Sequence, residues 1–165
     1  NKQNSLDYKK YYLVIKKFLN KYKSKIIFEP GRSIIGNTGT LISKIIYIKK
    51  SGKKNFIILD AAMNDLMRPA LYGAIHRIMP SLKKNKISNE NHEFVGPICE
   101  STDSFLNLKK FQELRENEIV VICDVGAYGM SLSSNYNLRP KPIELLIKGS
   151  KIKVIKKRQR HKDFI

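Results

Sequence analysis

The first thirty residues combine an amphipathic pattern with a short apolar run. Between residues 6 and 23, apolar side chains recur every three or four positions with lysines between them, which predicts one α-helix. The apolar positions of this helix are Tyr11, Ile15, Phe18, Leu19 and Tyr22. Residues 26–28 are Ile, Ile and Phe and stop at a Pro-Gly pair, so we expect a buried strand that ends in a turn.

From residue 40 onward, segments rich in β-branched residues alternate with turn residues. This alternation of β-branched segments and turns is typical of a mostly β domain. The predicted strands are 41–48, 56–59, 118–123 and 143–147. Gly149 and Ser150 separate two apolar segments and predict a tight hairpin.

One helix and one loop are expected inside this β region. Asn64 or Asp65 can cap a helix that runs to Arg77, with Pro69 in its first turn. The polar, Asn-rich segment 83–93 predicts a loop. The fold class predicted from the pattern is therefore mainly β with α, a mostly β domain preceded by one helix and one strand.

Composition limits the classes of protein that fit. The chain has 165 residues, of which 42% are hydrophobic and 28% charged, so one packed domain is expected. Its apolar runs are too short for a membrane span and it opens on no signal-peptide pattern, so we expect a soluble cytoplasmic protein without a membrane partner. The first residue is Asn1, and we expect that the sequence begins inside a longer product.

The net charge of +18 is concentrated at the ends of the chain. Residues 1–28 carry eight lysines against one aspartate, a net +7, and residues 148–165 carry eight basic residues against one aspartate, again +7. Such runs are more often solvated surface than a nucleic-acid site, so we expect no nucleic-acid partner. Two cysteines without CxxC spacing and three scattered histidines predict neither a disulfide framework nor a metal site.

Four segments carry functional groups that a simple strand or helix does not need. In the first, Glu29 and Arg32 flank a rigid Pro-Gly bend and can address two charged groups of one ligand; the alternative is a turn with an incidental ion pair. In the second, Arg68 and Tyr72 are four residues apart, so one helical face presents a guanidinium and a phenol that can grip a carboxylate. The alternative there is a capped helix with an exposed arginine.

The other two segments contain a thiol and a glycine-flanked aromatic residue. Cys99 lies next to Glu100 and close to Asp103, so a proton donor stands beside groups that can hold a substrate cation. For a lone cysteine the alternative is a small buried hydrophobe. Gly126 and Gly129 flank Tyr128 and allow the backbone to bring its ring close to a flat ligand; the alternative is a bend with an aromatic plug.

Together and in this order, the four segments resemble the diaminopimelate decarboxylases, pyridoxal-phosphate enzymes with the alanine-racemase-like fold. The resemblance covers residues 26–147. That family joins an amino-terminal (β/α)8 barrel to a carboxyl-terminal β-barrel or β-sandwich domain, so residues 1–39 would be the last helix and strand of the (β/α)8 barrel and residues 40–165 the β domain. It also implies a homodimer with active sites shared across the interface.

The resemblance further implies roles for individual residues. Glu29 would lie beside the pyridine nitrogen of pyridoxal 5'-phosphate, Cys99 would deliver a proton to the carbon that loses carbon dioxide, and Glu100 would neutralise the distal ammonium of the substrate. The implied cofactor-binding residues are Glu29, Pro30, Gly31, Arg32 and Tyr128. The implied substrate-binding residues are Arg32, Arg68, Tyr72, Glu100 and Tyr128.

The implied reaction is the decarboxylation of meso-2,6-diaminopimelate to L-lysine and carbon dioxide, the last step of lysine biosynthesis. Arg68, Tyr72 and the glutamate at position 100 favour this substrate over ornithine. Two alternatives stay open: a decarboxylase of another basic amino acid, of the ornithine, arginine or carboxynorspermidine type, and an inactive remnant with a basic binding surface. The Schiff-base lysine of the family belongs to a barrel segment that this sequence lacks, so the fragment alone is predicted to be inactive. Thr102 replaces a glycine of many relatives and is expected to restrict the loop after Cys99.

Overall fold

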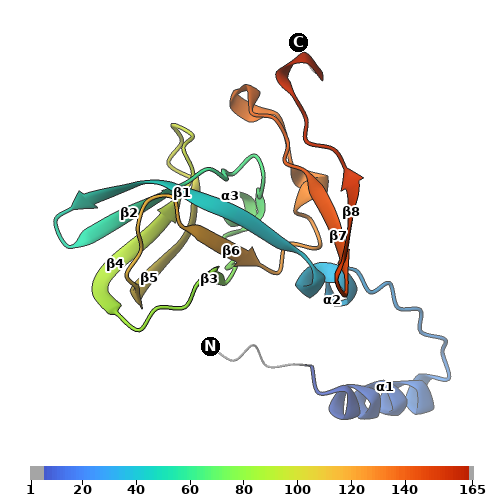
Figure 1. Cartoon of the computed structure of the whole chain (residues 1–165). Coiled ribbons are helices and arrows are strands. Elements are labelled where there is room, and N and C mark those ends of the chain that lie inside the picture. Colours follow the sequence, from blue (N-terminus) through green and yellow to red (C-terminus); the bar gives the residue numbers. More distant parts are fainter. Residues whose placement is uncertain (1–5, 164–165) are drawn as a thin grey trace. The chain divides into compact units, whose positions relative to one another are not determined.

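The computed structural model describes residues 6–163, which form two compact units (Figure 1). The first unit extends to Pro30 and the second begins at Gly31. The predicted domain limits, 1–39 and 40–165, stay a prediction, and their outer ends, residues 1–5 and 164–165, lie outside the described residues.

Helix α1, Tyr8–Tyr22, occupies most of the first unit and confirms the predicted helix. Asp7 caps it because its carboxylate accepts hydrogen bonds from the backbone N–H groups of Lys9 and Lys10, both at 3.1 Å. Lys23 ends the helix in a left-handed conformation. No residue of α1 is buried, so its apolar face is open within this unit.

The strand predicted at residues 26–28 is wrong. These residues form neither helix nor strand, and the Ile27 side chain is 87% exposed. A strand needs a neighbour to satisfy its backbone groups. Within residues 6–30 the only regular element is α1, which offers no strand edge.

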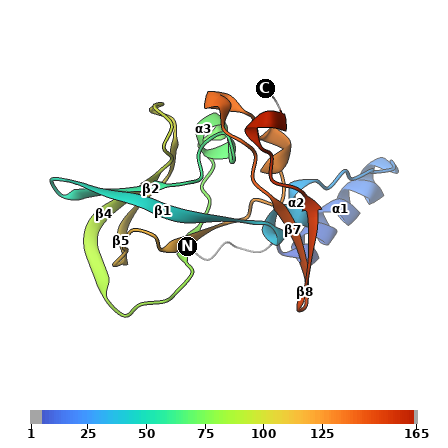
Figure 2. The same ribbon diagram turned by 45° about the horizontal axis from the view of Figure 1, so that its top comes forward.

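A curled six-stranded sheet dominates the second unit and confirms the predicted fold class (Figures 1 and 2). Its spatial order is β3-β6-β1-β2-β4-β5; β2 and β4 are parallel, and every other neighbouring pair is antiparallel. The strands are β1 Thr40–Ser51, β2 Lys54–Leu59, β3 Ile78–Pro80, β4 Ile87–Val95, β5 Ser104–Gln112 and β6 Ile119–Cys123. The first half of β1 pairs with β6 and the second half pairs with β2, so this one strand joins the two halves of the sheet.

The core lies on the concave face of this sheet. Strand β2 shows the alternation that a half-buried strand requires, since Asn55, Ile57 and Leu59 are buried and the residues between them are partly exposed. Seven core side chains are at most 1% exposed: Ile45, Ile57, Leu59, Leu66, Phe94, Val120 and Ile122. Burial of this apolar surface supplies the main driving force for folding of the second unit.

Two sequence predictions inside the sheet domain are wrong. Segment 83–93, predicted as a loop, contains most of β4, because His92 and Phe94 alternate inward between polar residues and the strand pairs on both sides. The helix predicted from Asn64 to Arg77 is only α3, Arg68–Tyr72. Gly73, with φ 60°, ends it in a conformation that glycine adopts without strain.

The carboxyl-terminal part forms a second, two-stranded sheet. Strands β7, Glu144–Lys148, and β8, Lys151–Lys156, pair around Gly149 and Ser150 and confirm the predicted hairpin. The remaining elements are short: α2 Arg32–Ile35, η1 Gly36–Thr38, η2 Met130–Leu132, η3 Tyr136–Leu138 and η4 His161–Asp163. Among residues 6–163, no helix combines the length and the apolar character needed to cross a membrane.

Candidate active site

Helix α3 presents Arg68 and Tyr72 on one face, as the sequence predicts. Arg68 begins this helix and Tyr72 ends it, and the guanidinium carbon of Arg68 lies 5.7 Å from the centre of the Tyr72 ring. This distance is in the range of a cation–π contact. The guanidinium and the phenol are therefore available to one ligand.

A second aromatic ring contacts the same guanidinium. The centre of the Tyr128 ring lies 5.8 Å from the guanidinium carbon of Arg68, and the Tyr128 side chain is 47% exposed. Tyr128 has φ 59°, a left-handed conformation that is unfavourable for a bulky residue. The strained backbone holds a partly exposed phenol next to Arg68.

The close approach of two backbone segments fixes this bend. The N–H of Gly126 donates to the carbonyl of Gly36 at 2.9 Å, and the N–H of Val125 donates to the carbonyl of Gly39 at 3.0 Å. A Cβ atom at Gly126 would lie only 2.1 Å from the carbonyl oxygen of Ile35, so only glycine fits here. The Tyr128 bend is thus docked on the segment that contains α2.

This docking brings the start of the second unit to the Tyr128 side chain. A Cβ atom at Gly31 would lie 3.4 Å from the Tyr128 hydroxyl, so the phenol oxygen is close to the Gly31 backbone. Arg32 follows as the first residue of α2 and is exposed. Glu29 and Pro30 are exposed at the end of the first unit.

His76 is a buried member of this site that the sequence analysis did not single out. Its side chain is 0% exposed, and Nδ1 donates to the backbone oxygen of Cys123 at 2.9 Å, since a carbonyl can only accept. Burial lowers the pKa of His76 below its usual value, and the nearby cations of Arg68 and Arg32 lower it further, against the raising effects of the Cys123 carbonyl and Asp124. The imidazole is therefore neutral near neutral pH.

Several cationic and polar groups of this site have no direct partner among residues 6–163. Within residues 6–163, neither Arg32 nor Arg68 forms an ion pair. Nε of Arg68 and Nε2 of His76 are buried and find no hydrogen-bond partner among those residues. The arrangement can bind an anion such as a carboxylate or a phosphate. We call Gly31, Arg32, Arg68, Tyr72, His76 and Tyr128 the arginine cluster.

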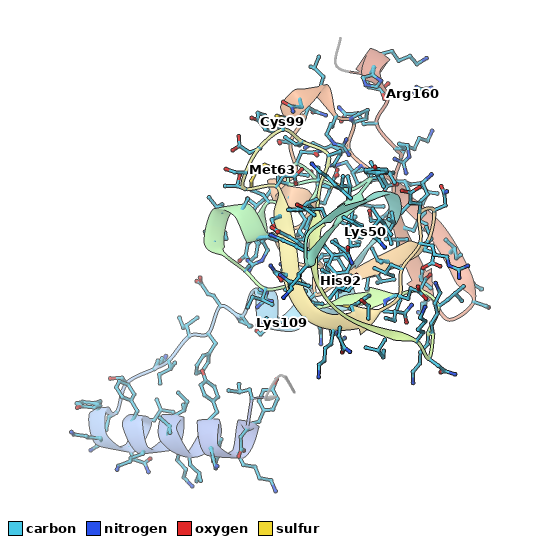
Figure 3. The ribbon with its side chains drawn as sticks, turned by 90° about the vertical axis from the view of Figure 1, so that its left-hand side faces the viewer. Lys50, Met63, His92, Cys99, Lys109 and Arg160 are labelled. Atoms are coloured by element: carbon cyan, nitrogen blue, oxygen red, sulfur yellow. The ribbon has the colours of Figure 1, made fainter. Side chains whose placement is uncertain are left out.

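Cys99 and Glu100 lie in a different part of the unit, on the loop 96–103 between β4 and β5. Both side chains are exposed, and Cys99 is a free thiol. An oxygen of the Glu100 carboxylate lies 3.5 Å from the Tyr136 hydroxyl. In the side-chain view, Cys99 and Met63 lie near each other at one end of the sheet, away from Lys109 (Figure 3).

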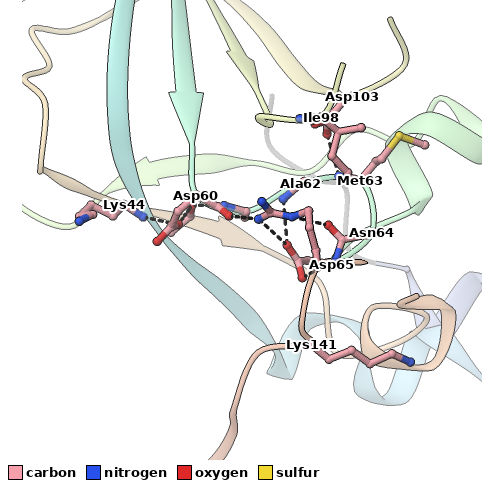
Figure 4. Close-up of polar contacts among 12 residues, drawn as sticks. Lys44, Asp60, Ala62, Met63, Asn64, Asp65, Ile98, Asp103 and Lys141 are labelled. Atoms are coloured by element: carbon pink, nitrogen blue, oxygen red, sulfur yellow. Dashed lines mark hydrogen bonds and ion pairs between the residues drawn. The ribbon is translucent and has the colours of Figure 1, made fainter. Parts of the chain in front are cut away.

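Asp103 closes this loop and does not face the thiol as a second carboxylate. Its side chain is 3% exposed and accepts hydrogen bonds from the backbone N–H groups of Met63 at 2.7 Å and Ile98 at 2.9 Å (Figure 4). Burial raises the pKa of Asp103 above its usual value, although these two bonds oppose the shift. Thr102 has no positive φ, and its hydroxyl contacts the Met63 sulfur at 3.7 Å, so the threonine fits this loop without backbone strain.

The turn that precedes α3 is held by Arg139. Its Nε donates to Oδ1 of the buried Asn64 at 3.0 Å, and its guanidinium also donates to the Asp60 carbonyl and lies 3.9 Å from the Asp65 carboxylate (Figure 4). Burial raises the pKa of Asp65, while the Ala62 N–H and the Arg139 cation lower it. This network fixes the segment from which Arg68 projects.

The predicted site residues therefore fall into separate groups. Within the described residues, no hydrogen bond, ion pair or ring contact joins Cys99 or Glu100 to the arginine cluster. Their segments are linked through Met63, five residues before Arg68, which contacts both Asp103 and Thr102 of the loop. In one chain, the thiol and the glutamate do not complete the anion site.

Comparison with known proteins identifies the family of the chain. Residues 8–126 match the family described as pyridoxal-dependent decarboxylase, C-terminal sheet domain. The chain belongs to this family. The resemblance predicted from the four segments is thereby confirmed.

Curated members of the family are similar over most of the chain. The diaminopimelate decarboxylase of Aquifex aeolicus is 42% identical over 152 residues, which are 92% of this chain and 36% of that protein. The diaminopimelate decarboxylase of Helicobacter pylori is 46% identical over 141 residues, which are 84% of this chain and 34% of that protein. The chain thus spans little more than a third of the length of the curated relatives it matches.

Solved structures of the family have the same fold. The diaminopimelate decarboxylase of Helicobacter pylori, complexed with L-lysine, superposes with a TM-score of 0.87 at 41% identity, covering 99% of this chain and 40% of that one. A lysine/ornithine decarboxylase of Vibrio vulnificus, complexed with cadaverine, superposes with a TM-score of 0.60 at 18% identity, covering 68% of this chain and 31% of that one. The second likeness shows the fold alone, so the substrate must be argued from the residues of the site.

Proposed function

We propose that this chain is the carboxyl-terminal part of a diaminopimelate decarboxylase, which converts meso-2,6-diaminopimelate to L-lysine and carbon dioxide with pyridoxal 5'-phosphate. The observation that carries the proposal is the unpaired guanidinium of Arg68, which contacts both Tyr72 and Tyr128. Diaminopimelate keeps one carboxylate after decarboxylation, and ornithine has no such second carboxylate. An uncompensated arginine beside two phenols suits the group that distinguishes the two substrates.

The arginine cluster fits an aromatic, anionic cofactor. The partly exposed Tyr128 ring can contact a flat ring, and the absence of a side chain at Gly31 leaves room beside the phenol. We assign cofactor binding to Glu29, Pro30, Gly31, Arg32 and Tyr128. When bound, pyridoxal phosphate accepts electrons as the bond from Cα to the carboxylate breaks, and Glu29 would keep its ring nitrogen protonated.

Other residues of this chain would hold the substrate and move a proton. Arg32, Arg68 and Tyr72 would bind the carboxylate that remains, and Glu100 would pair with the distal ammonium. The exposed thiol of Cys99 would donate a proton to the carbon that carried the departing carboxylate. Tyr136 lies 3.5 Å from Glu100 and would orient that carboxylate.

The separation of the two groups favours a homodimer. Cys99 and Glu100 lie on an exposed loop and make no described contact with the arginine cluster of their own chain. We assign them to the active site of a second copy, so that each site combines two chains. We place the enzyme in the cytoplasm, with no nucleic-acid or membrane partner.

A substrate panel tests the proposal. The complete polypeptide that contains this sequence is loaded with pyridoxal phosphate, and carbon dioxide release is measured with meso-diaminopimelate, ornithine, arginine and carboxynorspermidine. We expect turnover of diaminopimelate to exceed that of the other three, with lysine as product. Preference for one of the other amino acids would identify the corresponding decarboxylase instead. The 165-residue chain alone should release no carbon dioxide, because the Schiff-base lysine of the family lies outside it.

A further inference from the structure

We propose that Asp103 is a positioning residue that holds the Cys99–Glu100 loop in its working geometry and ties that loop to the segment leading into Arg68. The inference rests on the proposed function, because it concerns how the proposed proton donor is placed. It assigns a role to a carboxylate that touches neither substrate nor cofactor in that scheme.

Asp103 closes the loop with three hydrogen bonds between its two ends. Its carbonyl accepts from the N–H of Gly96 at 3.0 Å, and its Oδ2 accepts from the N–H of Ile98 at 2.9 Å. Its own N–H donates to the carbonyl of Glu100 at 3.0 Å. The two proposed catalytic positions, 99 and 100, therefore lie inside a ring of bonds that all involve one residue.

The second carboxylate oxygen reaches outside the loop. Oδ1 of Asp103 accepts from the N–H of Met63 at 2.7 Å (Figure 4). Met63 belongs to the turn that Arg139 holds through Asn64, and this turn leads directly into α3. Asp103 thus connects the Cys99–Glu100 loop, through hydrogen bonds, to the segment that leads into the helix carrying Arg68.

The Asp103 carboxylate is buried in a tightly packed space beside Gly96. The Asp103 side chain is 3% exposed, so water does not replace its backbone donors. A Cβ atom at Gly96 would lie 2.2 Å from Oδ2 of Asp103, which means that the carboxylate fills the space of a side chain at that position. A short acceptor with two oxygens is required here, and an amide would turn a donor toward one of the two N–H groups.

Hydrogen exchange tests the link in the 165-residue chain itself. In Asp103→Asn, the amide proton of either Met63 or Ile98 should exchange at least about tenfold faster than in the wild-type chain, since the side-chain amide keeps an acceptor for only one of them. Gly96→Ala, which displaces the carboxylate without changing it, should have the same effect and serves if the Asn variant does not fold. Asp60→Asn is the matched control, because Asp60 accepts the N–H of Lys44 at 2.8 Å on the other side of the turn. Unchanged exchange at both Met63 and Ile98 in both test variants would overturn the proposal.

A double-mutant cycle in the complete enzyme separates positioning from simple destabilisation. Asp103→Asn should lower kcat for diaminopimelate about tenfold or more in the wild-type background but less than about twofold when Cys99→Ser is already present. Equal losses in both backgrounds would mean that Asp103 acts on stability alone and would overturn the positioning role. A folded wild-type enzyme without decarboxylase activity would instead refute the proposed function, and the exchange experiment would still judge the link between Asp103 and Met63.

Discussion

The guanidinium of Arg68 lies 5.8 Å from the centre of the Tyr128 ring, and this contact joins helix α3 to the glycine bend that follows β6. Arg68 precedes β3 and Tyr128 follows β6, and these two strands are neighbours in the sheet. Their pairing places the two side chains together. The proposed substrate site of this chain is thus a direct product of the β3–β6 register.

The docking of the Tyr128 bend predicts a large effect of one added methyl group. In Gly126→Ala the new Cβ would collide with the Ile35 carbonyl at 2.1 Å, so the chain should lose about 2 kcal/mol or more of unfolding free energy. The control is Gly52→Ala, which has open space but a φ of 58° and should cost about 1 kcal/mol. Urea unfolding of the 165-residue chain measures both. Equal losses for the two variants would contradict the close approach of the bend and the α2 segment.

The buried imidazole of His76 predicts a pH dependence of stability. Its pKa is lowered in the folded chain from the usual 6.5, so the unfolded chain binds more protons between the lowered value and 6.5. The unfolding free energy should therefore be fully retained above pH 6.5 and fall as the pH drops through this window. In His76→Gln this component of the slope should disappear in urea titrations from about pH 8 to about pH 5. The same slope in both proteins would show that His76 is not buried as a neutral group.

The two cysteines should differ in reactivity. Cys99 is exposed, whereas Cys123 is 7% exposed and its thiol contacts the Met79 sulfur at 3.8 Å. An alkylating reagent should modify one thiol per native chain rapidly, and the second at least about a hundredfold more slowly, at a rate set by opening of the sheet. Cys99→Ser should abolish the rapid phase. A rapid phase that survives this substitution would place the exposed thiol elsewhere.

Local patterns predict the elements that depend on near neighbours. The helical spacing of α1, the hairpin turn at Gly149 and Ser150, and the i, i+4 pair of Arg68 and Tyr72 are all found as expected. Each depends on residues a few positions apart. The family resemblance supplies the remaining site assignments, because no local pattern reveals what Glu29 or Cys99 would bind.

Long-range contacts explain what the sequence does not reveal. Strand β4 is polar enough to resemble a loop, and pairing with β2 and β5 makes it a strand. The sequence suggests that Asp103 is a second acidic group next to Cys99. In the structure its carboxylate instead accepts a hydrogen bond from the backbone N–H of Met63, forty residues earlier. His76 carries no local signal, since its hydrogen-bond partner, the carbonyl of Cys123 at the end of β6, lies 47 residues away in the sequence.

The measurement that tests the central claim most directly is the substrate preference of the complete enzyme after replacement of Arg68. In Arg68→Met, kcat/KM for meso-diaminopimelate should fall about a hundredfold, equivalent to about 2.7 kcal/mol, because a charge-assisted bond to the second carboxylate is lost. Residual turnover of ornithine, which has no such carboxylate, should change by less than about threefold. Arg77→Met removes an exposed arginine outside the arginine cluster and should leave both activities within about twofold of wild type. Equal losses for the two substrates in Arg68→Met would contradict the assignment of Arg68 to the carboxylate that distinguishes diaminopimelate.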